Sequence, residues 1–278
     1  LLDGRIGDLQ LGAFRDGALH HRPGWDVTLS APKSVSIMAQ VAGDRRLIDA
    51  HGHAVKIAMA HVERHMAATR VRDGGTVARE ATGNLVIASF QHGTSRAQDP
   101  QLHTHNVIMN ATQGEDGGWR SLEPRALYQL QKQIGAIYRQ ELALKVRELG
   151  YEIDAGKESM FEIRDVPAGV IDAFSTRSAE IEAALVERGT SRDAASALEK
   201  QIAALDTREA KVLADQTGLV AQWRERAAKT GFGAEVRSMM VREAQARMAD
   251  PSHRARMAFE GENGAARAVA HAAAGLGE

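Results

Sequence analysis

The chain has 278 residues, of which 44% are hydrophobic, and a formal net charge of −1 at pH 7. It contains no cysteine, which excludes disulfides, thiol nucleophiles and cysteine-type zinc sites. The near-neutral charge means that any nucleic-acid contact has to come from a local basic patch. No apolar run is long enough to span a membrane and no signal peptide opens the chain, so a cytoplasmic protein is expected.

The N-terminal part of the chain contains one clear strand pattern. Residues 1–20 have a mixed composition, for which we expect a short helix and turns. Residues 25–30 alternate apolar and polar side chains, which is typical of a half-buried strand. The polar face of this strand carries Asp26, Thr28 and Ser30.

A long helix and a hairpin are predicted next. In residues 44–68, apolar side chains recur at steps of three and four, which predicts an amphipathic helix. His51 falls on the apolar stripe, where a histidine is expected to be a buried, hydrogen-bonded core residue. The triplet Asp73-Gly74-Gly75 indicates a tight hairpin turn within residues 69–84.

Two further strand-like runs, 85–92 and 102–112, carry three histidines. Successive strand side chains point to opposite faces, so His103 and His105 share a face. His92 ends the preceding strand, and the residues between contain Gly93 and Pro100, as a connecting loop does. If the two strands pair antiparallel, the three imidazoles can converge on one point.

Three converging imidazoles predict a metal site. Neutral imidazole is the commonest protein metal ligand, and three ligands leave coordination positions open for a substrate. Intrinsic affinity favours Zn²⁺, Ni²⁺, Cu²⁺ or Mn²⁺ over Mg²⁺, and Mg²⁺ or Mn²⁺ is expected as the ion that the cell supplies. Protons compete for imidazole ligands, so binding should weaken as pH falls through about 6.5. The alternative is a set of polar strand histidines that hold no metal.

The C-terminal half is predicted to be largely helical. Residues 121–149 read as one long helix, with Ser121 as N-cap and Gly150 just after its end. A short hairpin is expected over 151–163. The later segments are a helix from Pro167 to Gly189, shorter helices over 191–229, and a surface helix or linker over 233–278.

This order of elements indicates an α+β fold. Hairpin connections predict an antiparallel β-sheet with flanking helices, followed by a helical C-terminal extension.

The strand WDVTLSAPKS, the three spaced histidines and the GTSR segment between them together resemble the relaxase domain of conjugative relaxase–helicases of the TraI/TrwC type (MobF). These belong to the HUH endonuclease superfamily. The resemblance covers residues 1–232. It implies an HUH relaxase core over 1–164, a helical DNA-clasping extension over 165–232, and a tail or linker over 233–278 leading towards a helicase region.

The resemblance also implies an activity. Such domains bind single-stranded DNA at a plasmid transfer origin and nick one strand by transesterification, in which a tyrosine hydroxyl attacks the phosphate. The metal is held by the histidines that match His92, His103 and His105, and an aspartate matching Asp26 assists. Relaxosome and coupling proteins are the implied partners.

Several basic residues are candidates for contact with DNA. Arg96 lies in the GTSR segment, where it is placed to contact a phosphate, and Lys33 follows the first strand. The others are spread around the predicted sheet and extension: Arg70, Arg72, Arg120 and Arg177. Trp25 and Trp119 are either base-stacking platforms or core residues.

The tyrosine nucleophile of the resembled family precedes the strand that carries Asp26, whereas the first tyrosine here is Tyr128. We therefore expect that the family's N-terminal strand and tyrosine-bearing helix are absent, and that this polypeptide is inactive in covalent cleavage. Tyr138 is expected in the core, and neither Tyr128 nor Tyr151 is a strong substitute.

Two other functions remain open. One is a metal-dependent phosphodiester hydrolase that uses a bound water, with Asp26 as general base. The other is a non-catalytic module that recognises single-stranded DNA.

Overall fold

The computed structural model describes residues 2–207 and 216–260. The chain divides into two compact units, each built from segments that are distant in the sequence. Unit 1 comprises Leu1–Ser30, His51–His92 and His103–Leu142, and unit 2 comprises Ala31–Ala50, Gly93–Leu102 and Ala143–Glu278. The domain boundaries expected after residues 164 and 232 stay predictions.

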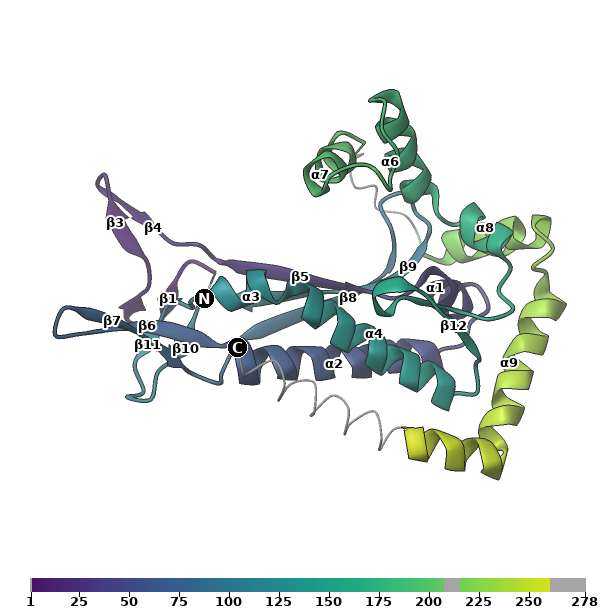
Figure 1. Cartoon of the computed structure of the whole chain (residues 1–278), viewed down its shortest axis with the longest axis horizontal. Helices are drawn as coiled ribbons and strands as arrows, with labels where there is room; N and C mark the ends of the chain where they lie inside the picture. Colours follow the sequence, from purple (N-terminus) through teal and green to yellow (C-terminus); the bar gives the residue numbers. More distant parts are fainter. Residues whose placement is uncertain (1, 208–215, 261–278) are drawn as a thin grey trace. The chain divides into compact units, whose positions relative to one another are not determined.

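A three-stranded sheet forms the centre of unit 1 (Figure 1). Its strands are β5 (Gly24–Ser30), β9 (Pro100–Met109) and β8 (Ile87–Thr94), with β9 in the middle. β5 pairs antiparallel with β9 over its full length. The predicted α+β fold with an antiparallel sheet is confirmed.

Helices α2 (Arg46–Met66) and α4 (Gln131–Glu148) run along one face of this sheet (Figure 1). The apolar stripe predicted for α2 is buried at every position: Leu47, His51, Val55, Ala58, Val62 and Met66. Burial on this side leaves the opposite face of the sheet to solvent.

Four two-stranded hairpins complete the strands of unit 1. They are β1 (Arg5–Ile6) with β2 (Leu9–Gln10), β3 (Ala13–Arg15) with β4 (Ala18–His20), β6 (Ala68–Asp73) with β7 (Thr76–Ala81), and β10 (Thr112–Gln113) with β11 (Trp119–Arg120). The predicted turn at Gly74 and Gly75 is confirmed, with both residues at positive φ.

The short helix expected within residues 1–20 is wrong, because this segment forms hairpins. Asp16 and Gly17 both adopt positive φ between β3 and β4. An Asp-Gly pair in this conformation is the signature of a two-residue hairpin turn, and it overrides any helical tendency of the flanking residues.

The single helix expected over 121–149 is also wrong, and Ser121 is not its N-cap. The structure has α3 (Arg125–Gln129) and α4, separated at Leu130. A residue that precedes proline avoids the helical region, which disfavours helix at Glu123, and the helix begins only after Pro124. The predicted glycine just after the end of α4, Gly150, has the expected positive φ.

Unit 2 contains a helix that the sequence pattern did not reveal, α1 (Lys33–Gln40). Six of its eight residues, Ser34–Ala39, are buried. A helix buried on nearly all sides lacks the polar face that makes helical periodicity visible.

The remaining elements of unit 2 are mostly helical. They are β12 (Ile153–Ala155), a 3₁₀ turn (Lys157–Ser159), β13 (Phe161–Ile163), α5 (Ala168–Ala173), α6 (Thr176–Glu187), α7 (Ala197–Asp206), α8 (Gln216–Lys229), α9 (Ala234–Ala249) and a helical segment over 251–260. The hairpin predicted over 151–163 is confirmed. The predicted tail is helical as far as residue 260, and its last residues, 261–278, lie outside the described part of the chain.

The helix expected from Pro167 to Gly189 is interrupted, which corrects that prediction. It starts after Pro167 as expected, but α5 ends at Ala173 and α6 begins anew at Thr176. The backbone N–H of Thr176 donates to the carboxylate of Asp99 at 2.9 Å instead of continuing the helix. Among the described helices, none is long and apolar enough to cross a bilayer.

Candidate metal centre

The three histidines singled out by their spacing come together on the solvent side of the central sheet. One ring nitrogen each from His92, His103 and His105 lies within 4.8 Å of the other two. The ring centroids are 5.2–5.4 Å apart. β8 supplies the first and β9 the other two, so the predicted convergence from two neighbouring strands is confirmed.

Asp26 and Thr28 on β5 fix the orientation of His105. Nδ1 of His105 lies 2.6 Å from Oδ2 of Asp26 and 3.0 Å from the hydroxyl of Thr28. An ionised carboxylate only accepts hydrogen bonds, so Nδ1 of His105 carries the hydrogen and donates a hydrogen bond to Asp26. The Nε2 lone pair of His105 is therefore left for a metal, as in carboxylate–histidine–metal triads.

The buried face of β9 holds the strand from behind. Thr104, between the two ligand positions, lies 2.7 Å from Nε2 of His51, and Nδ1 of His51 lies 2.7 Å from the hydroxyl of Tyr138. Burial, with a smaller effect of His103, lowers the pKa of His51 to about 4, so this imidazole is neutral. The expectation of a satisfied core histidine is confirmed.

Asn106 adds a second buried polar contact behind β9. Its side chain donates to the carbonyl of Val27 on β5 at 3.0 Å and accepts from the hydroxyl of Ser89 on β8 at 2.7 Å. A shift of β9 by one residue would turn both histidines into the core and would leave these buried polar groups without partners. The contacts therefore specify the register in which the histidines face solvent.

The donor set fits a divalent metal ion. Three neutral nitrogens match the ligand preference of Zn²⁺, Ni²⁺ and Cu²⁺. Their separation is close enough for small side-chain rotations to bring all three to the usual metal–nitrogen distance of about 2.0–2.1 Å. Three protein ligands leave open the positions that a substrate oxygen would occupy.

Lys33 is partly withdrawn from solvent in unit 2. Its ammonium group donates to the carbonyl of Pro100 at 3.1 Å and to the side-chain oxygen of Gln101 at 2.9 Å. Burial lowers the pKa of Lys33, and the nearby carboxylates of Asp99 and Glu162 partly offset this effect. These contacts anchor Lys33 to the start of β9, and its contact with DNA stays a prediction.

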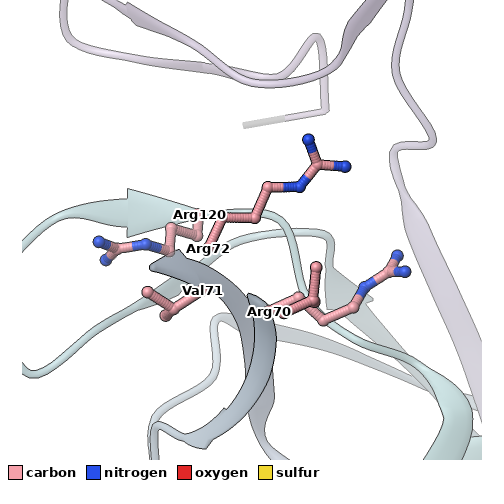
Figure 2. Close-up of a pocket in the computed structure, with 5 residues that line it drawn as sticks. Arg70, Val71, Arg72 and Arg120 are labelled. Atoms are coloured by element: carbon pink, nitrogen blue, oxygen red, sulfur yellow. The ribbon is translucent and has the colours of Figure 1, made fainter. Parts of the chain in front are cut away.

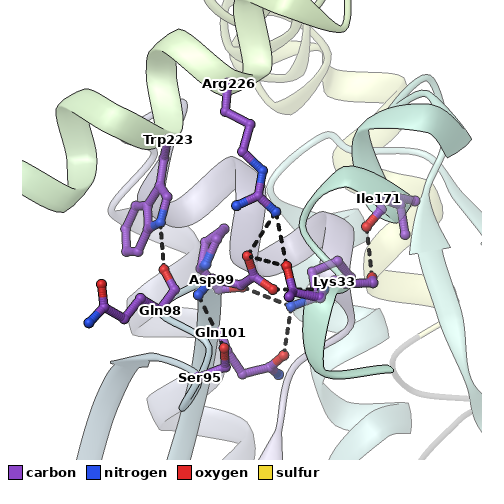
Figure 3. Close-up of polar contacts among 11 residues, drawn as sticks. Lys33, Ser95, Gln98, Asp99, Gln101, Ile171, Trp223 and Arg226 are labelled. Atoms are coloured by element: carbon purple, nitrogen blue, oxygen red, sulfur yellow. Dashed lines mark hydrogen bonds and ion pairs between the residues drawn. The ribbon is translucent and has the colours of Figure 1, made fainter. Parts of the chain in front are cut away.

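The connection between β8 and β9 is anchored through Asp99, whose side chain is almost fully buried (Figure 3). Its carboxylate accepts from the backbone of Thr176 and from Arg226, both at 2.9 Å. Next to it, the indole of Trp223 donates to the carbonyl of Gln98 at 2.7 Å. Arg96 is exposed in this anchored turn.

The predicted basic residues Arg70, Arg72 and Arg120 line one open pocket on the β6–β7 hairpin of unit 1 (Figure 2). The pocket has a volume of about 600 Å³, and Val71 and Val77 complete it. Arg120 forms a bidentate pair with Asp116 at 2.7 and 2.6 Å, so part of its charge is already balanced.

Arg177 belongs to unit 2, whereas Arg70, Arg72 and Arg120 belong to unit 1. Its guanidinium group joins α6 to the end of α7, donating to the hydroxyl of Thr207 at 2.8 Å and to the carbonyl of Ala204. These bonds give Arg177 a structural explanation, and its contact with DNA stays a prediction.

Neither tyrosine of unit 1, Tyr128 or Tyr138, faces the histidine triad. Tyr138 and Tyr151 are buried, and burial raises the pKa of both phenols. The hydroxyl of Tyr128 accepts a hydrogen bond from the indole of Trp25 at 2.9 Å. Trp25 lies on the buried face of β5, opposite Asp26, which places Tyr128 on the far side of the sheet from the triad.

One exposed aromatic side chain near the triad was missed by sequence reasoning. Trp25 is a core residue and Trp119 is half-buried, whereas Phe90 on β8 is exposed. Its position two residues before His92 puts it on the same strand face. That spacing was visible in the sequence and could have identified it.

Comparison with known proteins places this chain in a family. The TrwC relaxase family model matches residues 2–230. The multifunctional conjugation protein TraI of Escherichia coli (strain K12) is 44% identical over 243 residues, which is 84% of this chain. The chain spans 13% of the length of that relative.

Solved structures of the conjugative relaxase TrwC have the same fold. A metal-free complex with oriT DNA matches with a TM-score of 0.79 and 38% identity, covering 83% of this chain and 82% of that one. A copper-bound complex with oriT DNA matches with a TM-score of 0.78 and 39% identity, covering 83% and 79%. A complex with a 27-mer comprising the recognition hairpin and the cleavage site also gives 0.78 and 39%, covering 83% and 82%.

The family model covers most of the chain, and the curated relative is 44% identical over 84% of it. The chain belongs to the TrwC relaxase family.

Proposed function

We propose that this chain binds single-stranded DNA of a plasmid transfer origin and holds one phosphodiester at a divalent metal for strand-specific nicking. The observation that carries the proposal is the triad of His92, His103 and His105, with His105 oriented by Asp26. The TrwC relatives bound to oriT DNA, with and without metal, support the substrate class.

The chemistry at this site follows from the charge of a phosphodiester. A bound divalent cation supplies Lewis-acid stabilisation of the charge that builds on the non-bridging oxygens. The three imidazoles are neutral donors, so they leave the cation its full charge. Asp26 keeps His105 in the tautomer that presents Nε2. We propose Mg²⁺ or Mn²⁺ as the physiological ion, with Zn²⁺, Ni²⁺ and Cu²⁺ able to bind on intrinsic affinity.

The arginines of the β6–β7 hairpin are proposed to hold the DNA backbone. Arg70 and Arg72 project from one face of β6 and are exposed. Arginine pairs with phosphate through two parallel hydrogen bonds, so these side chains add affinity without reading sequence. Arg96, exposed in the turn after β8, is proposed to contact another phosphate of the strand.

We propose that none of the three tyrosines of this chain is the nucleophile. In the transesterification, a phenol gives up its proton as its oxygen forms a bond to phosphorus, the bond from phosphorus to the 3′ oxygen breaks, and the 3′ oxygen takes up a proton. Tyr138 and Tyr151 are buried and Tyr128 contacts Trp25 on the other side of the sheet. We infer that the 278 residues bind metal and DNA without forming a phosphotyrosyl link.

A gel experiment tests this proposal. The chain is incubated with Mn²⁺ and a fluorescent 27-mer carrying the recognition hairpin and cleavage site of the TrwC relative, then resolved on native and denaturing gels. We expect a protein–DNA complex on the native gel and no adduct on the denaturing gel. A covalent adduct would contradict the inference about the tyrosines. Turnover of a nitrophenyl phosphodiester would favour a hydrolase instead.

A further inference from the structure

Phe90 is a large aromatic side chain exposed on an edge strand. It is 53% exposed. Phe161, Phe174 and Phe232 are buried, and the other exposed phenylalanine with a described side chain is Phe259. Phe90 lies on β8, an edge strand of the described sheet, so its ring is accessible to a ligand.

The hydrogen bonds between β8 and β9 place this ring beside the metal ligands. The hydroxyl of Ser89 donates to the side chain of Asn106, and the backbone of Met109 donates to Val86. Both contacts belong to one antiparallel register, in which Phe90 lies directly across from His105. Cβ atoms of such neighbours are about 4.5–5.5 Å apart.

His105 is therefore flanked by two different surroundings. On β5, Thr28 pairs with it in the strand register, and Asp26 binds its Nδ1. On β8, its neighbour is the apolar ring of Phe90. Asp26 and Thr28 hold the imidazole of His105 in place. Phe90 therefore is not required to orient His105.

A nucleobase is the occupant that fits this position. A nucleotide whose phosphate lies at the triad carries its base, or that of the adjoining nucleotide, within reach of the neighbouring side chains. Bases stack on aromatic rings in single-strand binding sites, and loss of one such ring weakens binding about 5- to 150-fold. Trp25 and Tyr138 are on the buried face of the sheet, and Tyr128 contacts Trp25 there rather than the face that carries the triad.

We propose that Phe90 is a stacking platform for the base of a nucleotide next to the phosphate held by the histidine triad. This inference rests on the proposed DNA-binding function and adds a subsite to it. Stacking tolerates any base, so the platform fixes the position of the strand at the metal more than it selects sequence. Because the ring contacts one base, removing it should affect DNA binding at only one nucleotide position.

The test is a thermodynamic cycle in which substitutions in the protein are combined with abasic nucleotides in the DNA. Binding of Mn²⁺ and of the 27-mer is measured for the wild-type chain and for Phe90→Ala, Phe90→Tyr and Phe259→Ala. A series of 27-mers carries a single abasic nucleotide at each position flanking the cleavage site. Phe259→Ala is the matched control, because it removes another exposed phenylalanine from the helical segment 251–260.

We expect Phe90→Ala to weaken DNA binding about 5- to 150-fold with unchanged Mn²⁺ binding. Phe90→Tyr and Phe259→Ala should bind like the wild type. At one position, an abasic nucleotide should weaken DNA binding by the wild type by the same factor. The same abasic 27-mer should bind Phe90→Ala as tightly as the unmodified 27-mer does.

Three results would overturn the inference. The first is that the loss of DNA-binding free energy in Phe90→Ala adds fully to the loss caused by every abasic position. The second is that Phe90→Ala no longer binds Mn²⁺, which would indicate a structural role for the ring. The third is a wild-type dimer that Phe90→Ala dissociates and DNA does not. Failure of the wild type to bind any 27-mer in the presence of Mn²⁺ would instead remove the proposed function, and this inference with it.

Discussion

Oδ2 of Asp26 lies 2.6 Å from Nδ1 of His105, so a carboxylate on β5 orients a metal-ligand candidate on β9. Replacing Asp26 with Asn keeps the size and removes the charge that stabilises the Nδ1 proton. Loss of such a partner typically costs 10- to 100-fold in metal affinity. We predict a loss of this size for Asp26→Asn in Mn²⁺ or Ni²⁺ titration calorimetry.

The same substitution should leave folding almost unchanged, because Asp26 is on the exposed face of β5. Urea unfolding of the metal-free chain should change by about 0.5 kcal/mol or less. Unaltered metal affinity in Asp26→Asn would show that His105 does not depend on this carboxylate.

The second prediction concerns Thr104, on the buried face of β9, the strand that carries His103 and His105. Thr104→Val removes the hydroxyl that contacts His51 and leaves a buried ring nitrogen without a partner. We expect a loss of about 1–3 kcal/mol in the free energy of unfolding together with weaker metal binding, since Thr104 sits between two ligands. Thr104→Ser, which keeps the hydroxyl, should restore metal binding.

Thr69→Val is the matched control for this variant. Thr69 is equally buried in unit 1, and its hydroxyl donates to the carbonyl of Ser121 at 2.9 Å. This variant should lose stability and retain the wild-type metal affinity. Equal metal affinity in Thr104→Val and Thr69→Val would refute a positioning role for Thr104.

His51 predicts a pH dependence of stability. Burial, in the first place, lowers its pKa to about 4 in the folded chain, whereas an unfolded histidine titrates near 6.5. Between these values the unfolded chain binds a proton that the folded chain does not, so stability decreases as pH falls from about 6.5 to 4. The contribution amounts to roughly 3 kcal/mol.

An NMR titration of the His51 ring checks this directly, with urea unfolding at the same pH values. The ring should stay neutral down to about pH 4, and His51→Gln should show a smaller loss of stability over the window. A ring that titrates near pH 6.5 in the folded chain would contradict the buried hydrogen-bond arrangement.

The β6–β7 hairpin predicts a salt dependence of DNA binding. The double variant Arg70→Ala and Arg72→Ala removes two exposed guanidinium groups. Each lost phosphate contact should lower the slope of log K against log salt by about 0.7–0.9. Arg254→Ala, which removes an exposed arginine elsewhere, should not change the slope. An unchanged slope in the double variant would exclude these residues from the DNA contact.

The features that sequence alone predicted are those set by short periodicities. A two-residue period placed His103 and His105 on one face and Asp26 on the polar face of its strand. The helical period identified the buried stripe of α2, including His51. Each of these follows from local geometry, so no tertiary information was needed.

The features that failed depend on tertiary contacts or on stronger local rules. α1 has no polar face because it is buried on nearly all sides. The bond from Arg177 to Thr207, thirty positions later in the chain, is likewise invisible to any local pattern, and the contact of Arg177 with DNA stays a prediction. The break before α3 was readable from Pro124, and the helical periodicity of the following residues concealed it.

The most direct test of the metal site is calorimetric titration of the wild-type chain with Mn²⁺ or Ni²⁺, alongside His103→Ala and His65→Ala. His65 stacks with His61 on α2, away from the triad in the sequence, so it controls for unspecific histidine binding. The account predicts one ion per chain for the wild type and His65→Ala, and loss of that site in His103→Ala. Equal binding by the wild type and His103→Ala would contradict it.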